Sequence, residues 1–183
     1  MCLNFASAKN PGGGFISGAE AQEESLARTS ALYETQLQAG DYYKIHRNME
    51  SCFYTDMMIY SPKVPVFRKD KGELLSKPVL CNFITSPAVN AGVVKRQEPE
   101  RKGEIYGAMD IRMEKMFALA LSQGNETLIL GAWGCGVFKN DPQEIADLFK
   151  KHLHGKYRNK FKRVVFAVLT KNEMMLELFE SIL

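Results

Sequence analysis

Close cysteine pairs are missing from this 183-residue sequence. Its four cysteines, at positions 2, 52, 81 and 135, stand singly, without a CxxC pair and without a histidine at metal-ligand spacing. Secreted disulfide frameworks and structural zinc sites need such groupings, so we expect reduced thiols. No other cluster of His, Asp and Cys suggests a metal site either, and we expect no metal and no cofactor.

Long apolar runs are also missing. No segment approaches the roughly 20 apolar residues of a membrane helix, and no charged-then-apolar leader opens the chain. We therefore expect no membrane association and a cytoplasmic protein, or a nuclear one if the source is eukaryotic.

A large net charge is absent as well, since the formal value is +3. That charge is too small to indicate a nucleic-acid binder, and we predict no direct nucleic-acid binding. One stretch, "KKHLHGKYRNKFKR" (150–163), carries seven Lys or Arg and no acid. We interpret it as a solvated helix end and loop; the alternative is a surface that attracts a polyanion.

Apolar strands alternating with amphipathic helices are what the sequence does contain. This alternation predicts an α/β layered domain with a largely parallel or mixed sheet, most simply one domain over 1–183. The prolines in 53–68 limit that region to short or edge strands. We expect the other strands at 2–6, 78–87, 127–133 and 163–170, and helices at 19–39, 104–123, from Asp141–Pro142 onward, and at 172–183.

Two glycine-rich loops, 12–14 and 134–136, each follow an expected strand and precede an expected helix. Ligands of such sheets bind at the carboxyl ends of strands. Glycines let backbone N–H groups approach an anion, and the following helix adds a positive end. Neither loop matches the P-loop or the G-x-G-x-x-G pattern. A tight turn and a diphosphate cradle therefore both remain open.

Three acids, Glu20, Glu23 and Glu24, follow the first loop at a helix start. The helix dipole favours acids there, and Glu24 can pair with Arg28 one turn on. Alternatively, one carboxyl group binds a sugar hydroxyl and the other transfers a proton, because neighbouring helical side chains point about 100° apart. A carboxyl group beside a bound phosphate is expected to have a raised pKa, which suits a general acid.

The stretch "PGGGFISGAEAQEES" resembles the GGG-x7-QEE signature of the poly(ADP-ribose) glycohydrolases. "LNFASAKNPGGGF", "ITSPAVNAG" and "LGAWGCGVFKNDP" extend the similarity to the microbial-type branch over nearly the whole chain. The resemblance implies a macrodomain-like three-layer αβα fold with a mixed central sheet. Members of this branch carry a further segment before the "NFAS" strand. Met1 stands three residues before Asn4, so we expect this N-terminal segment to be shortened.

The resemblance also implies a function: hydrolysis of the ribose–ribose O-glycosidic bonds of poly(ADP-ribose), from the chain end, with release of ADP-ribose. Glu24 would be the general acid and base, and Glu23 would hold ribose hydroxyls. Phe138 would pack against the distal ribose. The implied residues that bind ADP-ribose are Asn10, Gly12, Gly13, Gly14, Gln22, Asn90, Gly134, Cys135, Gly136, Val137 and Phe138.

Ordinary structural roles compete for some of these residues. By default Phe138 and Trp133 are core aromatics, and Cys135 is a small loop residue, since no histidine is placed to activate its thiol. The expected partners are poly(ADP-ribose) or an ADP-ribosylated protein, with ADP-ribose as product ligand. Two other functions remain open: a non-catalytic ADP-ribose-binding macrodomain, and a hydrolase that removes mono-ADP-ribose.

Overall fold

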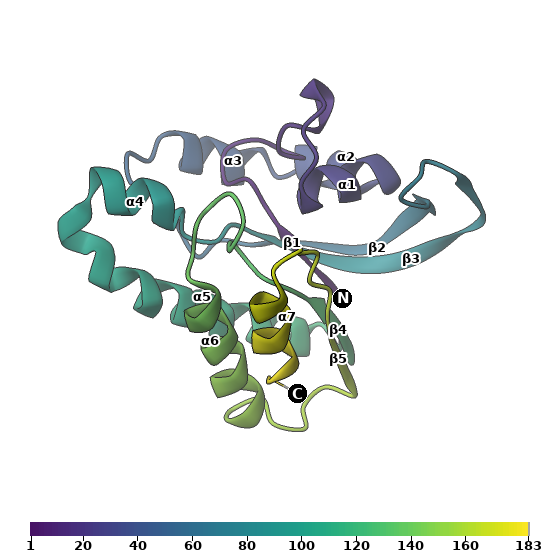
Figure 1. Cartoon of the computed structure of the whole chain (residues 1–183). Coiled ribbons are helices and arrows are strands. Elements are labelled where there is room, and N and C mark those ends of the chain that lie inside the picture. The colour runs from purple at the N-terminus through teal and green to yellow at the C-terminus, as the bar shows by residue number, and fades with distance from the viewer. Residues whose placement is uncertain (183) are drawn as a thin grey trace. The chain divides into compact units, whose positions relative to one another are not determined.

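A computed structural model of the chain describes residues 1–182 (Figure 1). The chain forms two compact units. The N-terminal unit comprises Cys2–Met49 and Met57–Pro87, and the C-terminal unit comprises Met1, Glu50–Asp56 and Ala88–Leu183. A single domain over 1–183 remains a prediction. None of the helices within residues 1–182 combines the length and apolar character that crossing a membrane requires.

The N-terminal unit contains three strands, β1 (Cys2–Phe5), β2 (Ile59–Arg68) and β3 (Leu74–Ser86). β1 runs parallel to β3, and β2 runs antiparallel to β3. Their order is β2-β3-β1, so parallel and antiparallel pairs occur in one sheet. Leu3 and Ile84, from adjacent strands, are fully buried. The mixed sheet of the predicted α/β class is thus present in this unit.

Prolines shape strand β2 as the sequence predicts. Pro62 and Pro65 lie on the outer strand of the order β2-β3-β1, where a missing N–H is tolerated. The pairing with β3 shifts between Ser61 and Val64, and Lys63 between them has a φ of 52°. This shift is a bulge that absorbs the irregular backbone.

Strand β3 is longer and less buried than the expected segment 78–87. It starts at Leu74, and Val79 and Leu80 are more than half exposed. Burial begins at Phe83, where the pairing with β1 also begins. Only the last third of β3 is therefore buried.

One helix over 19–39 is a wrong prediction, because three helices occupy this region and its continuation. They are α1 (Gln22–Thr29), α2 (Leu32–Leu37) and α3 (Gly40–Arg47). Ser30 breaks the first two apart: its backbone is extended and forms a bridge with Val66 of β2, while its hydroxyl donates to the carbonyl of Leu26. A tertiary contact thus overrides the helical periodicity, and Gly40 begins a helix instead of ending one.

The C-terminal unit contains two parallel strands and four α-helices among its described residues. β4 (Thr127–Leu130) pairs with β5 (Arg163–Phe166), and both end earlier than the expected strands. α6 packs against α5 and α7 (Figure 1, green to yellow). The helices are α4 (Ala91–Gln97), α5 (Ile105–Ser122), α6 (Pro142–His154) and α7 (Glu173–Glu180).

Apolar side chains of α5 and α6 form the core of the C-terminal unit. The Phe117 ring stacks on that of Tyr157 with centroids 5.1 Å apart and meets Phe149 edge-on. Met113 of α5 is fully buried, which confirms that the methionines of this helix fill the core. Trp133 is fully buried too, which confirms its predicted core position.

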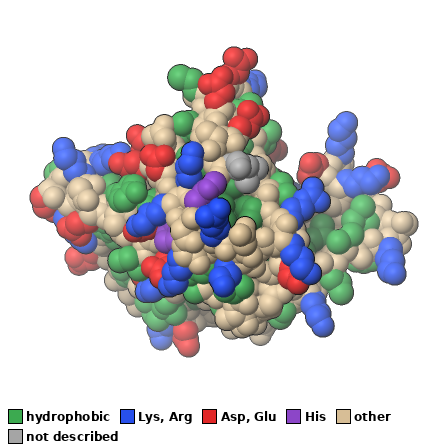
Figure 2. All heavy atoms as spheres, turned by 90° about the horizontal axis from the view of Figure 1, so that it is seen from below, with side chains coloured by type: hydrophobic (Ala, Val, Ile, Leu, Met, Phe, Trp, Pro, Cys, Tyr) green, Lys and Arg blue, Asp and Glu red, His purple; other side chains and the backbone are tan. Residues whose placement is uncertain are grey.

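Within residues 1–182, three of the seven basic side chains in the stretch 150–163 form ion pairs with acids. Lys151 pairs with Asp110, and Lys156 pairs with Glu114. A third ion pair joins Lys162 to Glu126. Figure 2 shows basic side chains interspersed with acidic ones and histidines on this surface. The pairing favours a solvated surface over a site for a polyanion.

The start of α6 supplies a first prediction. Asp141 caps the helix, with Oδ1 accepting from the N–H groups of Gln143 at 2.8 Å and Glu144 at 3.4 Å. We expect Asp141→Ala to lower the free energy of unfolding by about 1 kcal/mol, because two helix-end donors lose their acceptor. Urea denaturation measures this change. The exposed Asp147→Ala in the same helix is the control, and an equal loss in both variants would contradict the cap.

Candidate active site

The first glycine loop has a backbone that only glycine adopts easily. Gly12 and Gly13 have φ values of 66° and 60°, in the left-handed region. A Cβ atom on Gly13 would lie 2.3 Å from Oε1 of Glu24 and 3.1 Å from Oε2 of Glu23. The glycine therefore allows both carboxylates to approach the loop.

The N–H groups of the three glycines are all engaged within the protein. Gly12 donates to Oε1 of Gln36 at 2.9 Å, Gly13 to the carbonyl of Asn10 at 3.0 Å, and Gly14 to Oε1 of Glu24 at 2.9 Å. The sequence suggested that these groups face an anion. In the structure they organise the loop and the glutamates, and contact of the loop with a diphosphate stays a prediction.

Glu24 is the third residue of α1, and backbone groups hold its carboxylate on both sides. Oε1 accepts from Gly14 N, and Oε2 accepts from Ala21 N at 3.2 Å. The second bond also satisfies a free N–H at the helix start. The residue is 9 % exposed, and the two backbone donors fix its carboxylate in place.

Glu23 is buried, with 2 % of its surface exposed, and lies among neutral donors. Oε1 accepts from Asn4 Nδ2 at 3.1 Å and from Gln36 Nε2 at 2.8 Å, while Oε2 accepts from Ser7 N at 2.6 Å. Burial raises the pKa of Glu23 from 4.5 to about 7; the three donors oppose this rise, and the charge of Glu24 adds to it. The structure thus brings together the glycines and both glutamates of the predicted site.

Gln22 and Asn10 make contacts with the protein itself. Oε1 of Gln22 accepts from Phe5 N and Nε2 donates to the carbonyl of Leu3, both at 2.8 Å, which ties α1 to β1. Asn10 is exposed, and its backbone N–H donates to Oγ of Ser7 at 3.1 Å. Substrate binding by either side chain stays a prediction.

The raised pKa of Glu23 predicts how stability changes with pH. A carboxyl group whose pKa is higher in the folded state stabilises the protein below its unfolded pKa, and this contribution is lost as the pH rises through the folded pKa. We therefore expect the free energy of unfolding to fall by on the order of 3 kcal/mol as the pH rises from about 4.5 to above 7, because of Glu23.

Urea denaturation at pH 5 and pH 8 tests this expectation. Glu23→Gln stays neutral, so its loss of stability between the two pH values should be smaller than that of the wild type. Equal losses would show that Glu23 does not titrate in this range.

The second glycine loop lies in the C-terminal unit and needs glycine at one position. Gly134 has a φ of 75°, and a Cβ there would lie 2.4 Å from that of Ala88, whereas Gly136 has open space around it. Asn140 Nδ2 fastens the loop by donating to the carbonyls of Gly134 at 3.1 Å and Val89 at 2.8 Å.

Cys135 of this loop is buried, and burial raises the pKa of its thiol to about 12. A thiol with such a pKa is protonated at neutral pH and is a poor nucleophile. This supports a loop role for Cys135.

Asn90 and Phe138, two predicted site residues, are neighbours in the C-terminal unit. Asn90 caps α4 through its side chain, and Gly92 N in the same helix donates to the carbonyl of Phe138 at 2.9 Å. The ring of Tyr54 lies 6.3 Å from that of Phe138, and its hydroxyl hydrogen-bonds to Asn90. Val137 is 78 % exposed.

Sequence reasoning missed Tyr54 and its support. Tyr54 has a φ of 57°, unusual for a residue with a side chain. The buried Arg112 donates to the carbonyls of Phe53 at 2.8 Å and Tyr54 at 3.3 Å, and also to Asp56. Arg112 comes 58 positions after Tyr54, so no local pattern signals this contact.

The sequence also gave no signal for Gln36 or Asn4, since each contacts Glu23 from a different element. Gln36 lies on α2 and Asn4 on β1. Only the packing of these elements makes them partners of the acid.

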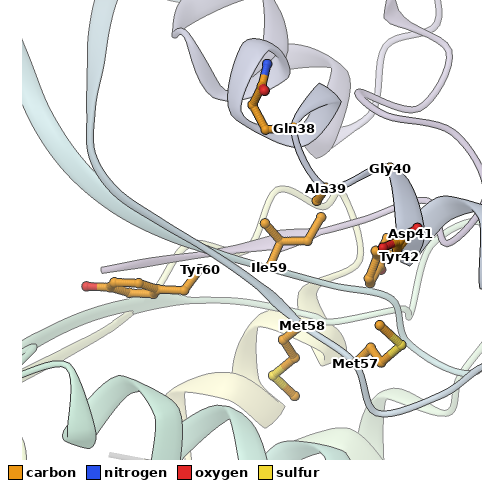
Figure 3. A pocket seen from close by; sticks show the side chains of 9 residues that line it. All are labelled: Gln38, Ala39, Gly40, Asp41, Tyr42, Met57, Met58, Ile59 and Tyr60. Carbon is orange, nitrogen blue, oxygen red and sulfur yellow. The ribbon is translucent and has the colours of Figure 1, made fainter.

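A cavity of about 570 Å³ lies elsewhere in the N-terminal unit (Figure 3). It is lined by residues 38–42, which link α2 to α3 and form the first turn of α3, and by residues 57–60. It therefore contains neither glutamate nor any glycine of the first loop. Within residues 1–182 no group of His, Cys, Asp and Glu is arranged to hold a metal ion. The candidate site is therefore defined by its carboxylates and not by this cavity.

Comparisons with known proteins point to one family. The family model "Microbial-type PARG, catalytic domain" matches residues 1–69, which include the glycine loop and both glutamates. No curated protein matches the chain.

Solved structures match over almost the whole chain. Poly(ADP-ribose) glycohydrolase from Deinococcus radiodurans, in complex with ADP-ribose, is 46% identical over 98% of this chain and 73% of its own, with a TM-score of 0.92. The enzyme from Thermomonospora curvata is 43% identical over 100% of this chain and 67% of its own, with a TM-score of 0.93. Its complex with the inhibitor ADP-HPD gives 43% identity over 98% and 69%, with a TM-score of 0.89.

Proposed function

The chain belongs to the microbial-type poly(ADP-ribose) glycohydrolase family, and we propose that it hydrolyses poly(ADP-ribose) with Glu24 as general acid and base. The similarity confirms the predicted macrodomain-like α/β fold. The geometry at Glu24 supports this proposal: the N–H of Gly14 in the glycine loop and the N–H of Ala21 at the helix start orient its carboxylate.

The proposed reaction breaks the bond between the anomeric carbon of one ribose and the hydroxyl oxygen of the next. Protonated Glu24 gives its proton to the departing oxygen, and the sugar passes through an oxocarbenium-like state. Water then adds to the anomeric carbon, and the Glu24 carboxylate takes a proton from it. The products are ADP-ribose and a shortened polymer, and Glu24 ends protonated again.

Glu23 has a different role in this proposal. A carboxylate has about four acceptor positions, and protein donors use three on Glu23. The remaining position can accept a ribose hydroxyl. Because Glu23 is buried among fixed donors, it suits orienting a sugar better than exchanging protons with water.

Further binding contacts to the substrate are assigned to Phe138 of the second loop and to Asn90. Phe138 is half-buried beside Tyr54, and we assign it to the distal ribose, with Asn90 lining the same region. Gripping a terminal ribose favours cleavage from the chain end. The ligand that these groups select is ADP-ribose, as product or as the end of a polymer.

The test is release of ADP-ribose from labelled poly(ADP-ribose) by the wild type. We expect single ADP-ribose units from the start of the reaction, without free oligomers. A mono-ADP-ribosylated protein is assayed in parallel, and faster release from it would assign the site to mono-ADP-ribose instead. Binding of ADP-ribose without any release would identify a non-catalytic binding module and overturn the proposal.

A further inference from the structure

Gln36 is a fully buried residue of α2 that contacts both the first glycine loop and Glu23. Its Oε1 accepts from Gly12 N at 2.9 Å, and its Nε2 donates to Oε1 of Glu23 at 2.8 Å. One carboxamide therefore joins the glycine loop to the acid assigned to the ribose.

The two contacts require a glutamine side chain. Gly12 N needs an acceptor, and the Glu23 carboxylate needs a donor, so the group between them must carry one of each. A carboxylate offers only acceptors, and a hydrocarbon offers neither. Because the bonds are buried, removing Gln36 leaves a donor and an acceptor unsatisfied, which costs more than the bonds themselves contribute.

Two further donors and two titratable neighbours act on Glu23 besides Gln36. Asn4 Nδ2 and Ser7 N already donate to the carboxylate from β1 and the segment after it. The charge of Glu24 disfavours ionisation of Glu23. The buried Tyr43 of α3 interacts electrostatically with Glu23, and its own pKa is raised by burial and by Glu23. The donors are thus what holds Glu23 in one orientation as an acceptor.

We propose that Gln36 is a positioning residue that holds Glu23 as an oriented acceptor for the ribose and couples it to the glycine loop. The inference rests on the proposed function, because it assumes that Glu23 contacts ADP-ribose. It goes further in making ADP-ribose affinity depend on a donor from α2.

The variant Gln36→Glu tests the donor specifically, with ADP-ribose binding measured by calorimetry at pH 6 and pH 8.5. At pH 6 the two facing carboxyl groups can share a proton, which restores a donor to Glu23, while the new side chain still accepts from Gly12 N. We expect an affinity within about threefold of the wild type there. As the pH rises to 8.5, a larger fraction of the variant loses the shared proton and two like charges then face each other, so we expect its affinity relative to that of the wild type to be at least about threefold lower than at pH 6.

The matched control is Gln38→Glu, which adds the same charge at an exposed position just after α2. It should follow the wild type at both pH values. If Gln36→Glu is weakened equally at pH 6 and pH 8.5, the role of Gln36 is merely structural and the inference is overturned. Unchanged affinity at both pH values overturns it as well.

A second variant covers the case in which Gln36→Glu does not fold. Gln36→Met has a similar length but no donor and only a weak acceptor, and we expect it to bind ADP-ribose about tenfold more weakly at both pH values. Unchanged affinity of a folded Gln36→Met would contradict the inference. The proposed function fails separately, when the wild type itself does not release ADP-ribose from poly(ADP-ribose).

Discussion

Replacing Glu24 by glutamine is expected to lower kcat on poly(ADP-ribose) by about 10³-fold, while ADP-ribose still binds. The amide cannot donate a proton to the departing oxygen or take one from water. Its oxygen can still accept from Gly14 N, so the glycine loop should keep its conformation, while the bond from Ala21 N at the helix start is lost. The loss should therefore appear in kcat and leave the affinity for the product nearly unchanged.

Two measurements separate these effects. Release of labelled ADP-ribose reports turnover, and the rise in melting temperature with added ADP-ribose reports binding. Glu20→Gln makes the same chemical change at an exposed position four residues earlier and should behave as the wild type. Comparable turnover by Glu24→Gln and the wild type would exclude Glu24 as the proton donor.

Gly13→Ala is expected to lower kcat/KM by more than about 100-fold and the free energy of unfolding by about 3 kcal/mol. The new Cβ would lie 2.3 Å from Oε1 of Glu24, so the carboxylate or the loop must move. A shift of about 1 Å in a catalytic group is enough for a loss of that size in rate. The positive φ and the overpacking each destabilise the fold.

Gly18→Ala is the matched control, because Gly18 also has a positive φ, of 86°, but open space around it. Gly18→Ala should lower the free energy of unfolding by only about 1–2 kcal/mol and leave turnover unchanged. Urea denaturation and the release assay measure the two effects. If both alanine variants lose the same stability and activity, backbone strain and not the approach of Glu24 explains the need for Gly13.

Sequence patterns predicted well those elements whose signals are local. Helix α6 begins where Asp141 and Pro142 place it, and α5 follows its apolar spacing. The region 19–39 failed because Ser30 pairs with Val66, a residue 36 positions away in β2. Periodicity describes which face of a helix is apolar, but it does not reveal where a distant strand will interrupt that helix.

The sequence by itself predicted that the first glycine loop and the two acids lie together, because they stand within 13 positions of one another and carry a family signature. Only the tertiary structure decided the environment of those acids. β1 and α2 bring Asn4 and Gln36 onto Glu23; burial raises the pKa of Glu23, and the hydrogen bonds from these two donors oppose that rise. Burial and hydrogen-bond partners depend on which elements pack together, so residue types and spacing alone do not specify them.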